Sequence, residues 1–154
     1  MAPDAAVVVG EALLLAIAAF AYGGPMRRAL AALKYSGVSR LAPVLAGAAL
    51  PALSRLRSVS GAAALVPVPV HLERRSARGY NQAELLARSL GDHAAMPLAD
   101  CLVRVRPTTK QHGLDRTARL HNLRGAFAVA DRVPRTVILV DDIITTTATL
   151  EACA

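Results

Sequence analysis

The chain has 154 residues, of which 54% are hydrophobic and only 3% aromatic. This length and hydrophobic content exclude a disordered chain and suit one domain with a sizeable core, while so few aromatic residues argue against the stacking platforms that bind single-stranded nucleic acid. The formal net charge of +7 favours a polyanionic ligand, such as a diphosphate or a nucleic acid, although a solvated basic surface explains it equally well.

The first apolar stretch, residues 7–22, has the hydropathy of an export signal or a membrane span but fits neither. Glu11 interrupts it, no basic residue precedes it, and it is short for a span of about 20 residues. We expect a buried strand over residues 16–22 and leave residues 1–15 as an N-terminal segment without assigned structure. The two cysteines show no metal-ligand or disulfide spacing, so we expect a cytoplasmic protein that does not bind a membrane.

Two helices are predicted next. Pro25 fits the first turn of a helix in which apolar residues recur at helical spacing, and Gly37 ends it. A second helix is predicted over residues 39–49, because Pro51 lacks the N–H that a helix interior needs. Residues 54–61 are predicted to be a polar, basic connection.

The middle of the chain is predicted to hold a strand, a loop and a helix. Residues 64–70 (ALVPVPV) are typical of a strand, but the two prolines must lie at its end or on one unpaired side, because proline donates no hydrogen bond. Residues 71–80 form an arginine-rich polar loop. Asn81 then caps a helix over residues 82–90, which closes at Gly91.

Shorter elements follow. We expect a strand over residues 101–105, a mobile loop over residues 106–114, a helix over residues 115–123 and a brief strand over residues 127–130. Strands that alternate with helices in this way predict a mostly parallel sheet.

The segment VILVDDIITTTAT, residues 137–149, carries most of the chemical information. VILV is typical of a strand buried on both faces of a parallel sheet, and Asp141 and Asp142 follow where that strand should end. A threonine-rich turn and a helix near Leu150 come next. This combination suits a phosphorylated sugar, because helix N–H groups bind phosphate while carboxylates bind ribose hydroxyls or a metal ion. The alternative is an ordinary strand-to-helix junction with a threonine cap and solvated acids.

This segment resembles the motif that binds phosphoribosyl diphosphate (PRPP) in type I phosphoribosyltransferases. Three other segments are similar to the ComF family, the competence-associated branch of that fold: YGGPMRRALAALKYSG, VPVPVHLERRSARGYNQAELLA and RVRPTTKQHGLDRTARLHNLRGAFAV. The resemblance covers residues 16–154. It implies an α/β, type I phosphoribosyltransferase-like domain with a mostly parallel central sheet flanked by helices. We expect this domain to lack the family's N-terminal zinc ribbon and the C-terminal end of the fold.

The resemblance also implies a Mg²⁺-dependent transfer of a phosphoribosyl group from PRPP to an unknown nitrogen nucleophile. The implied catalytic residues are Asp141, Asp142 and Lys110. The two aspartates would bind the ribose 2′ and 3′ hydroxyls, directly or through Mg²⁺, and Lys110 and Gln111 would lie on a loop that closes over the site. The implied phosphate ligands are Thr145, Thr146, Thr147, Ala148 and Thr149, and the implied basic residues on the diphosphate side are Arg74, Arg75 and Arg78.

A second function stays open, in which the chain is a catalytically weak accessory protein for DNA uptake or processing. It would bind DNA or a helicase-like partner. Three features favour it: the resemblance to the competence family, the basic excess, and Thr147 at a position where the family motif has glycine. Glycine suits a phosphate loop because its backbone adopts positive φ and approaches the ligand closely.

Overall fold

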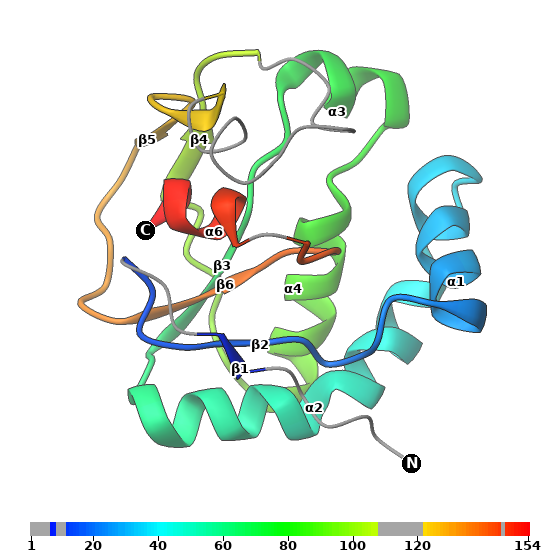
Figure 1. Cartoon of the computed structure of the whole chain (residues 1–154), viewed down its shortest axis with the longest axis horizontal. Helices are drawn as coiled ribbons and strands as arrows, with labels where there is room; N and C mark the ends of the chain where they lie inside the picture. The colour runs from blue at the N-terminus through cyan, green and yellow to red at the C-terminus, as the bar shows by residue number, and fades with distance from the viewer. Residues whose placement is uncertain (1–6, 9–11, 108–121, 146) are drawn as a thin grey trace.

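The computed structural model describes residues 7–8, 12–107, 122–145 and 147–154 and has a mixed α/β architecture (Figure 1). Its described strands form three two-stranded sheets, of which β3–β6 is parallel while β1–β2 and β4–β5 are antiparallel. The elements are β1 (Val7–Val8), β2 (Ala16–Ile17), α1 (Gly24–Tyr35), α2 (Leu41–Ser60), β3 (Ala64–Pro67), α3 (Leu72–Arg78), α4 (Gln82–Ala94), β4 (Leu102–Arg104), β5 (Phe127–Val129), β6 (Val137–Val140) and α6 (Ala148–Cys153).

The parallel pair β3–β6 lies at the centre of the molecule. Its register places Ala64 opposite Val137, and the N–H of Val68 continues the pairing by donating to the carbonyl of Val140 at 2.9 Å. An isolated parallel bridge joins Leu65 to Leu98 on the other side of β3. The prediction of a mostly parallel sheet is therefore correct for this pair and wrong for β4–β5, which pair with each other.

Strand β6 is packed on both faces, as its sequence predicted. Ile138 and Val140 belong to a core formed with α1, α2 and α4, and α2 lies across the bottom of Figure 1. Leu139 points to the opposite face, where it packs with Ala16 and Leu150. This alternation follows from the two-residue period of a strand.

Helix α2 overturns the prediction that Pro51 ends the second helix. Its last residue is Ser60, and Gly61, with φ of 63°, caps its C-terminal end. Most of residues 54–61, which were predicted to be a connection, are therefore helical. Proline removes one helical hydrogen bond. The helix continues because Leu45 and Leu53, on either side of the proline, are both buried in the core shared with α4. Here burial outweighs local propensity.

Helix α3 lies where the sequence predicted an arginine-rich loop. The ring Nδ1 of His71 accepts a hydrogen bond from the N–H of Glu73 at 3.4 Å, and Gly79 ends the helix with φ of 82°. None of its residues is buried. An exposed helix of this kind has no apolar periodicity for a sequence pattern to detect.

Helix α4 begins at its predicted cap, since the side chain of Asn81 accepts from the N–H of Ala83 at 3.1 Å. The prediction that this helix closes at Gly91 is wrong, because the helix continues to Ala94. Gly91 has another role, because a Cβ atom there would lie 2.6 Å from the carbonyl oxygen of Met96.

The remaining predictions have mixed outcomes. Helix α1 and strands β4, β5 and β6 lie where they were predicted, whereas the strand over residues 16–22 is limited to two residues. The predicted loop over residues 106–114 and helix over residues 115–123 fall mostly outside the described residues. No helix in the described part of the chain has the length and apolar character needed to cross a membrane.

Candidate functional site

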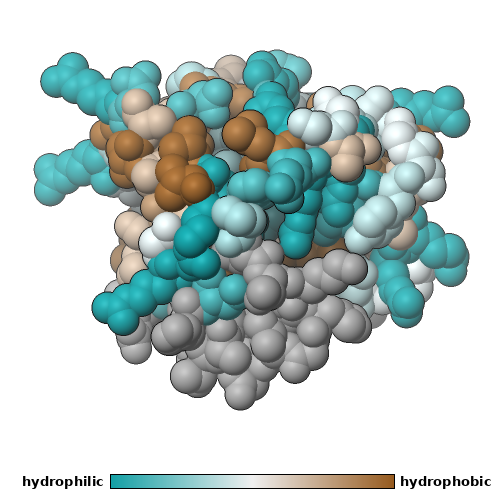
Figure 2. Space-filling model, turned by 90° about the horizontal axis from the view of Figure 1, so that it is seen from above, coloured by the Kyte–Doolittle hydropathy of each residue, from teal (hydrophilic) through white to brown (hydrophobic). Residues whose placement is uncertain are grey.

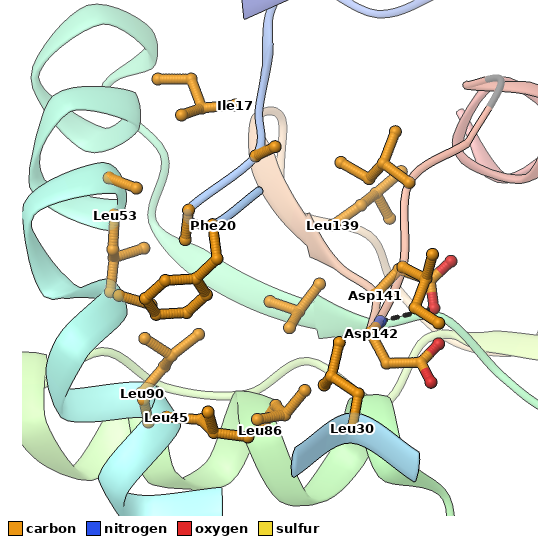
Figure 3. Close-up of a pocket in the computed structure, with 18 of the residues that line it drawn as sticks. Ile17, Phe20, Leu30, Leu45, Leu53, Leu86, Leu90, Leu139, Asp141 and Asp142 are labelled. Carbon is orange, nitrogen blue, oxygen red and sulfur yellow. Dashed lines mark hydrogen bonds between the residues drawn. The ribbon is translucent and has the colours of Figure 1, made fainter. Parts of the chain in front are cut away.

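Asp141 and Asp142 follow the last residue of β6 and lie between two cavities. One is polar, with a volume of about 320 Å³, and the other is apolar, with a volume of about 370 Å³; both carboxylates line both cavities. In Figure 3, Phe20, Leu53 and Leu90 surround the apolar cavity, and the two carboxylates lie at its edge and point away from them. The N–H of Asp142 donates to Asp141 Oδ1 at 2.8 Å, which fixes the pair.

The polar cavity collects positive charge from separate elements. α1, α3 and β4 supply four cations to its wall, so cations outnumber the two carboxylates. Helix α3 lies at the top of Figure 1, and Figure 2 shows the molecule from that side. Hydrophilic side chains gather near the middle of this view. Such a cavity attracts an anion while its carboxylates remain free to bind hydroxyls or a cation. The four cations are Lys34, Arg74, Arg78 and Arg104.

Burial and crowding of cations both act on Arg104. Desolvation lowers the pKa of its guanidinium, and the nearby positive charge of Arg74 lowers it further. The cost of holding like charges close together is relieved when an anion binds between them. An anion is therefore electrostatically complementary to this wall.

Asn81 links the residue that follows β3 to the start of α4, where both border the cavity. It is buried, and its Nδ2 donates to the carbonyl of Val68 at 2.9 Å while its Oδ1 caps α4. The neighbouring Gln82 is also buried, and its Oε1 accepts from Arg78 Nη1 at 3.1 Å. These contacts place the start of α4 and the end of α3 relative to β3.

The structure brings several predicted site residues together at the polar cavity. Asp141, Asp142, Arg74 and Arg78 line it, and so do two threonines of the predicted phosphate turn. Those threonines are Thr145 and Thr149.

Other predicted residues are placed elsewhere. Arg75 is not part of the wall and instead forms an ion pair with Glu84 at 3.2 Å. Thr147 is buried, with φ of 0°, and its Oγ1 donates to Glu151 Oε1 at 3.0 Å. Ala148 is buried at the first position of α6. The predicted residues outside the described part of the chain are Lys110, Gln111 and Thr146.

Four polar residues of the wall were not assigned to the site from the sequence. Asn81 and Gln82 end the RGYNQ segment, and their polar identity next to a helix start was a usable signal. Lys34 and Arg104 gave no such signal, because each is one basic residue in a helix or strand, and only the fold brings them to the acidic pair.

The acidic pair has the ligand chemistry that a magnesium ion prefers. No cluster of three or more His, Cys, Asp or Glu side chains occurs within the described ranges, so protein ligands would be limited to Asp141 and Asp142. Two carboxylate groups supplemented by water and phosphate oxygens suit Mg²⁺, which prefers oxygen ligands and keeps much of its hydration. The residues present therefore fit Mg²⁺ delivered with a phosphorylated ligand.

Burial, and then the charge of Asp142, raises the pKa of Asp141 from 3.8 to about 7. The folded protein therefore holds a proton on Asp141 at pH values where the unfolded chain has released it. We expect the free energy of unfolding to fall as the pH rises from about 4 to about 7, by an amount on the order of 1–3 kcal/mol. Urea titrations at several pH values between 4 and 7 measure this change in the free energy of unfolding.

The control for this pH dependence is an exposed carboxylate. Asp141→Asn should flatten the profile, whereas Asp131→Asn should leave it unchanged, since Asp131 is exposed and does not line the cavity. A wild-type profile that rises between pH 4 and pH 7 would contradict the raised pKa.

Cys153 does not supply a nucleophile to this site. Burial and the nearby charge of Asp141 raise the pKa of its thiol to about 12, so the thiolate is scarce at neutral pH. The described residues of the site offer binding and charge stabilisation by carboxylates and cations.

Two kinds of curated protein are similar to this chain. Competence protein F of Haemophilus influenzae is 44% identical over 92 residues, which cover 56% of this chain and 40% of the relative. DNA utilization protein YhgH of Escherichia coli K12 is 31% identical over 139 residues, or 86% of this chain and 61% of the relative, and its Salmonella typhi counterpart is 30% identical over 138 residues. The chain thus covers less than two thirds of these relatives. No family model matches it, and no solved structure matches it significantly.

Proposed function

We propose that the chain, which is similar to these competence and DNA utilization proteins, belongs to the ComF family and binds PRPP together with Mg²⁺ as a phosphoribosyltransferase-like protein. The observation that carries the proposal is the polar cavity, in which an acidic pair at the end of a central strand faces a wall of cations. We further propose that the β3–β6 core is the centre of a type I phosphoribosyltransferase-like fold.

The residues of the cavity suit the charges of such a reaction. Displacement of diphosphate leaves positive charge on the sugar and negative charge on the leaving group. Asp141 and Asp142 would orient the ribose and favour the cationic sugar, while Arg74 and Arg78 would bind the diphosphate. Mg²⁺, when bound, would neutralise part of the diphosphate charge. The phosphoribosyl group would pass to a nitrogen nucleophile.

Thermal unfolding with a ligand series tests the proposal. A ligand at a hundredfold excess over its Kd stabilises the folded protein by about 2.7 kcal/mol, which raises Tm by roughly 5–10 °C for a chain of this size. We expect this shift with PRPP and Mg²⁺, a smaller one with ribose 5-phosphate, and the loss of most of the effect when EDTA replaces Mg²⁺. An unchanged Tm at millimolar PRPP and Mg²⁺ would reject the proposal.

Two adjacent arginines provide a matched pair of variants. Arg74 lines the cavity, whereas Arg75 pairs with Glu84 outside it. Arg74→Ala should weaken PRPP binding roughly tenfold, because it removes one charge-assisted contact to the ligand. Arg75→Ala, with the same change in net charge, should alter it less than about twofold. If a calorimetric titration showed the same loss of PRPP affinity in both variants, only the net charge of the protein would determine binding.

The names of the relatives favour a second candidate, an accessory role in DNA utilization. Two relatives are called competence and DNA utilization proteins, and the chain has a net charge of +7. In this role the cationic wall would contact DNA phosphates, and we expect affinity to fall steeply with salt. Fluorescence anisotropy with a labelled duplex, with and without PRPP, separates the candidates. Competition by PRPP would place both ligands on one surface, and the absence of DNA binding at low salt would remove this candidate.

A further inference from the structure

Lys34 extends from the last turn of α1 to the acidic pair. Its Nζ lies 2.6 Å from Asp142 Oδ2, and only 21% of the lysine side chain and 13% of the aspartate side chain are exposed. The ammonium group therefore lies on a carboxylate that, under the proposed function, would hold the ribose and its metal ion.

The turn that carries Lys34 is anchored on both sides. The preceding residue, Leu33, is fully buried, and its carbonyl accepts a hydrogen bond from the hydroxyl of Tyr80. The ring of the following residue, Tyr35, lies under the guanidinium of Arg78, with 5.3 Å between Cζ and the ring centroid. Both neighbours are thus tied to the end of α3 or to the segment that follows it, so the ion pair is a built feature of the fold.

An ammonium group and a divalent cation compete for the same oxygen of Asp142. A metal ion that binds there must displace the ammonium, and a mostly buried ammonium without an acceptor is unfavourable. Lys34 lines the polar cavity as well, so an oxygen of a phosphate-bearing ligand in that cavity is a suitable new acceptor. A metal ion that arrives alone provides no such acceptor.

We propose that Lys34 is an exchangeable counter-ion: it opposes the binding of a bare divalent cation to Asp142 and moves to a phosphate oxygen when the cation arrives with a phosphorylated sugar. The inference rests on the proposed function, because the exchange requires a ligand that carries both the metal ion and a phosphate. The site would then favour the metal–PRPP complex over the metal ion alone.

The test compares two affinities in the full chain and in Lys34→Met. Mn²⁺ binding without PRPP is followed by the electron paramagnetic resonance signal of the free ion, and PRPP binding at saturating Mg²⁺ by calorimetry. Lys34→Met should bind Mn²⁺ roughly tenfold more tightly and PRPP roughly tenfold less tightly, since one charge-assisted contact is removed in each case. A lysine that only supports the fold would not produce effects of opposite sign.

Two further variants control for charge and packing. Arg28→Met removes a positive charge from the exposed surface of the same helix and should change neither affinity. Lys34→Arg keeps a cation at the position and should stay close to the wild type in both measurements.

Each other outcome has a definite meaning. Unchanged or weaker Mn²⁺ binding by Lys34→Met overturns the exchange, and so does the absence of Mn²⁺ binding by either protein at millimolar concentration. A further outcome is that Lys34→Met binds Mn²⁺ more tightly, as expected, but the wild type does not bind PRPP with Mg²⁺. The proposed function then fails, and so does the transfer of Lys34 to a phosphate oxygen. The competition between Lys34 and the metal ion still stands.

Discussion

Replacing both Asp141 and Asp142 by asparagine is expected to weaken PRPP binding about a hundredfold or more. The two carboxylates are the acidic groups of the polar cavity, and each loses a charge-assisted contact to the ribose or to Mg²⁺. Asparagine has the same shape, so the loss reports on charge. Calorimetry with PRPP and Mg²⁺ measures the affinity, and diphosphate release is expected to disappear with it.

Asp131→Asn is the matched control for this double variant. It removes an acid from the same C-terminal part of the chain, but Asp131 is exposed and contacts the neighbouring backbone N–H of Arg132 at 2.6 Å. Its PRPP affinity should equal that of the wild type. If the double variant retained wild-type affinity while Asp131→Asn did too, the acidic pair would have no part in ligand binding.

Gly91→Ala is expected to destabilise the protein by about 2–3 kcal/mol, because the added methyl group has no room. The new Cβ would lie 2.6 Å from the carbonyl oxygen of Met96 and 3.0 Å from Leu98 Cδ1. The first of these atoms belongs to the backbone, so relief requires the turn after α4 to move. Urea unfolding measures the change in free energy.

Gly47→Ala is the control within another helix. The Cβ atom there would meet only the side chain of His93, at 3.6 Å, which is an ordinary contact. Alanine should therefore stabilise α2 by about 0.5–1 kcal/mol through its higher helix propensity. If Gly91→Ala gave the same gain as Gly47→Ala, the close approach at Met96 would be wrong.

The sequence could predict the elements whose residues alternate or recur clearly. VILV, residues 137–140, is the clearest case, because its β-branched run matched a strand packed on both faces. Asn81 likewise identified the start of a helix, because asparagine is a preferred N-cap residue. Local chemistry alone sufficed in both places.

Two of the errors arose where tertiary packing overrides a local rule. Pro51 and Gly91 are typical helix-ending residues, yet one lies within a helix held by buried neighbours and the other permits a backbone contact. Neither effect is visible in a single segment. The prediction of the site residues was incomplete for the same reason. Only the fold brings Lys34 and Arg104 to the cavity that holds Asp141 and Asp142.

Calorimetric titration of the full chain with PRPP, in the presence of Mg²⁺ and again in EDTA, tests the central claim most directly. The account predicts saturable binding of one PRPP per chain with Mg²⁺, and binding weakened at least about tenfold in EDTA. The absence of saturable binding at millimolar PRPP with Mg²⁺ would contradict it.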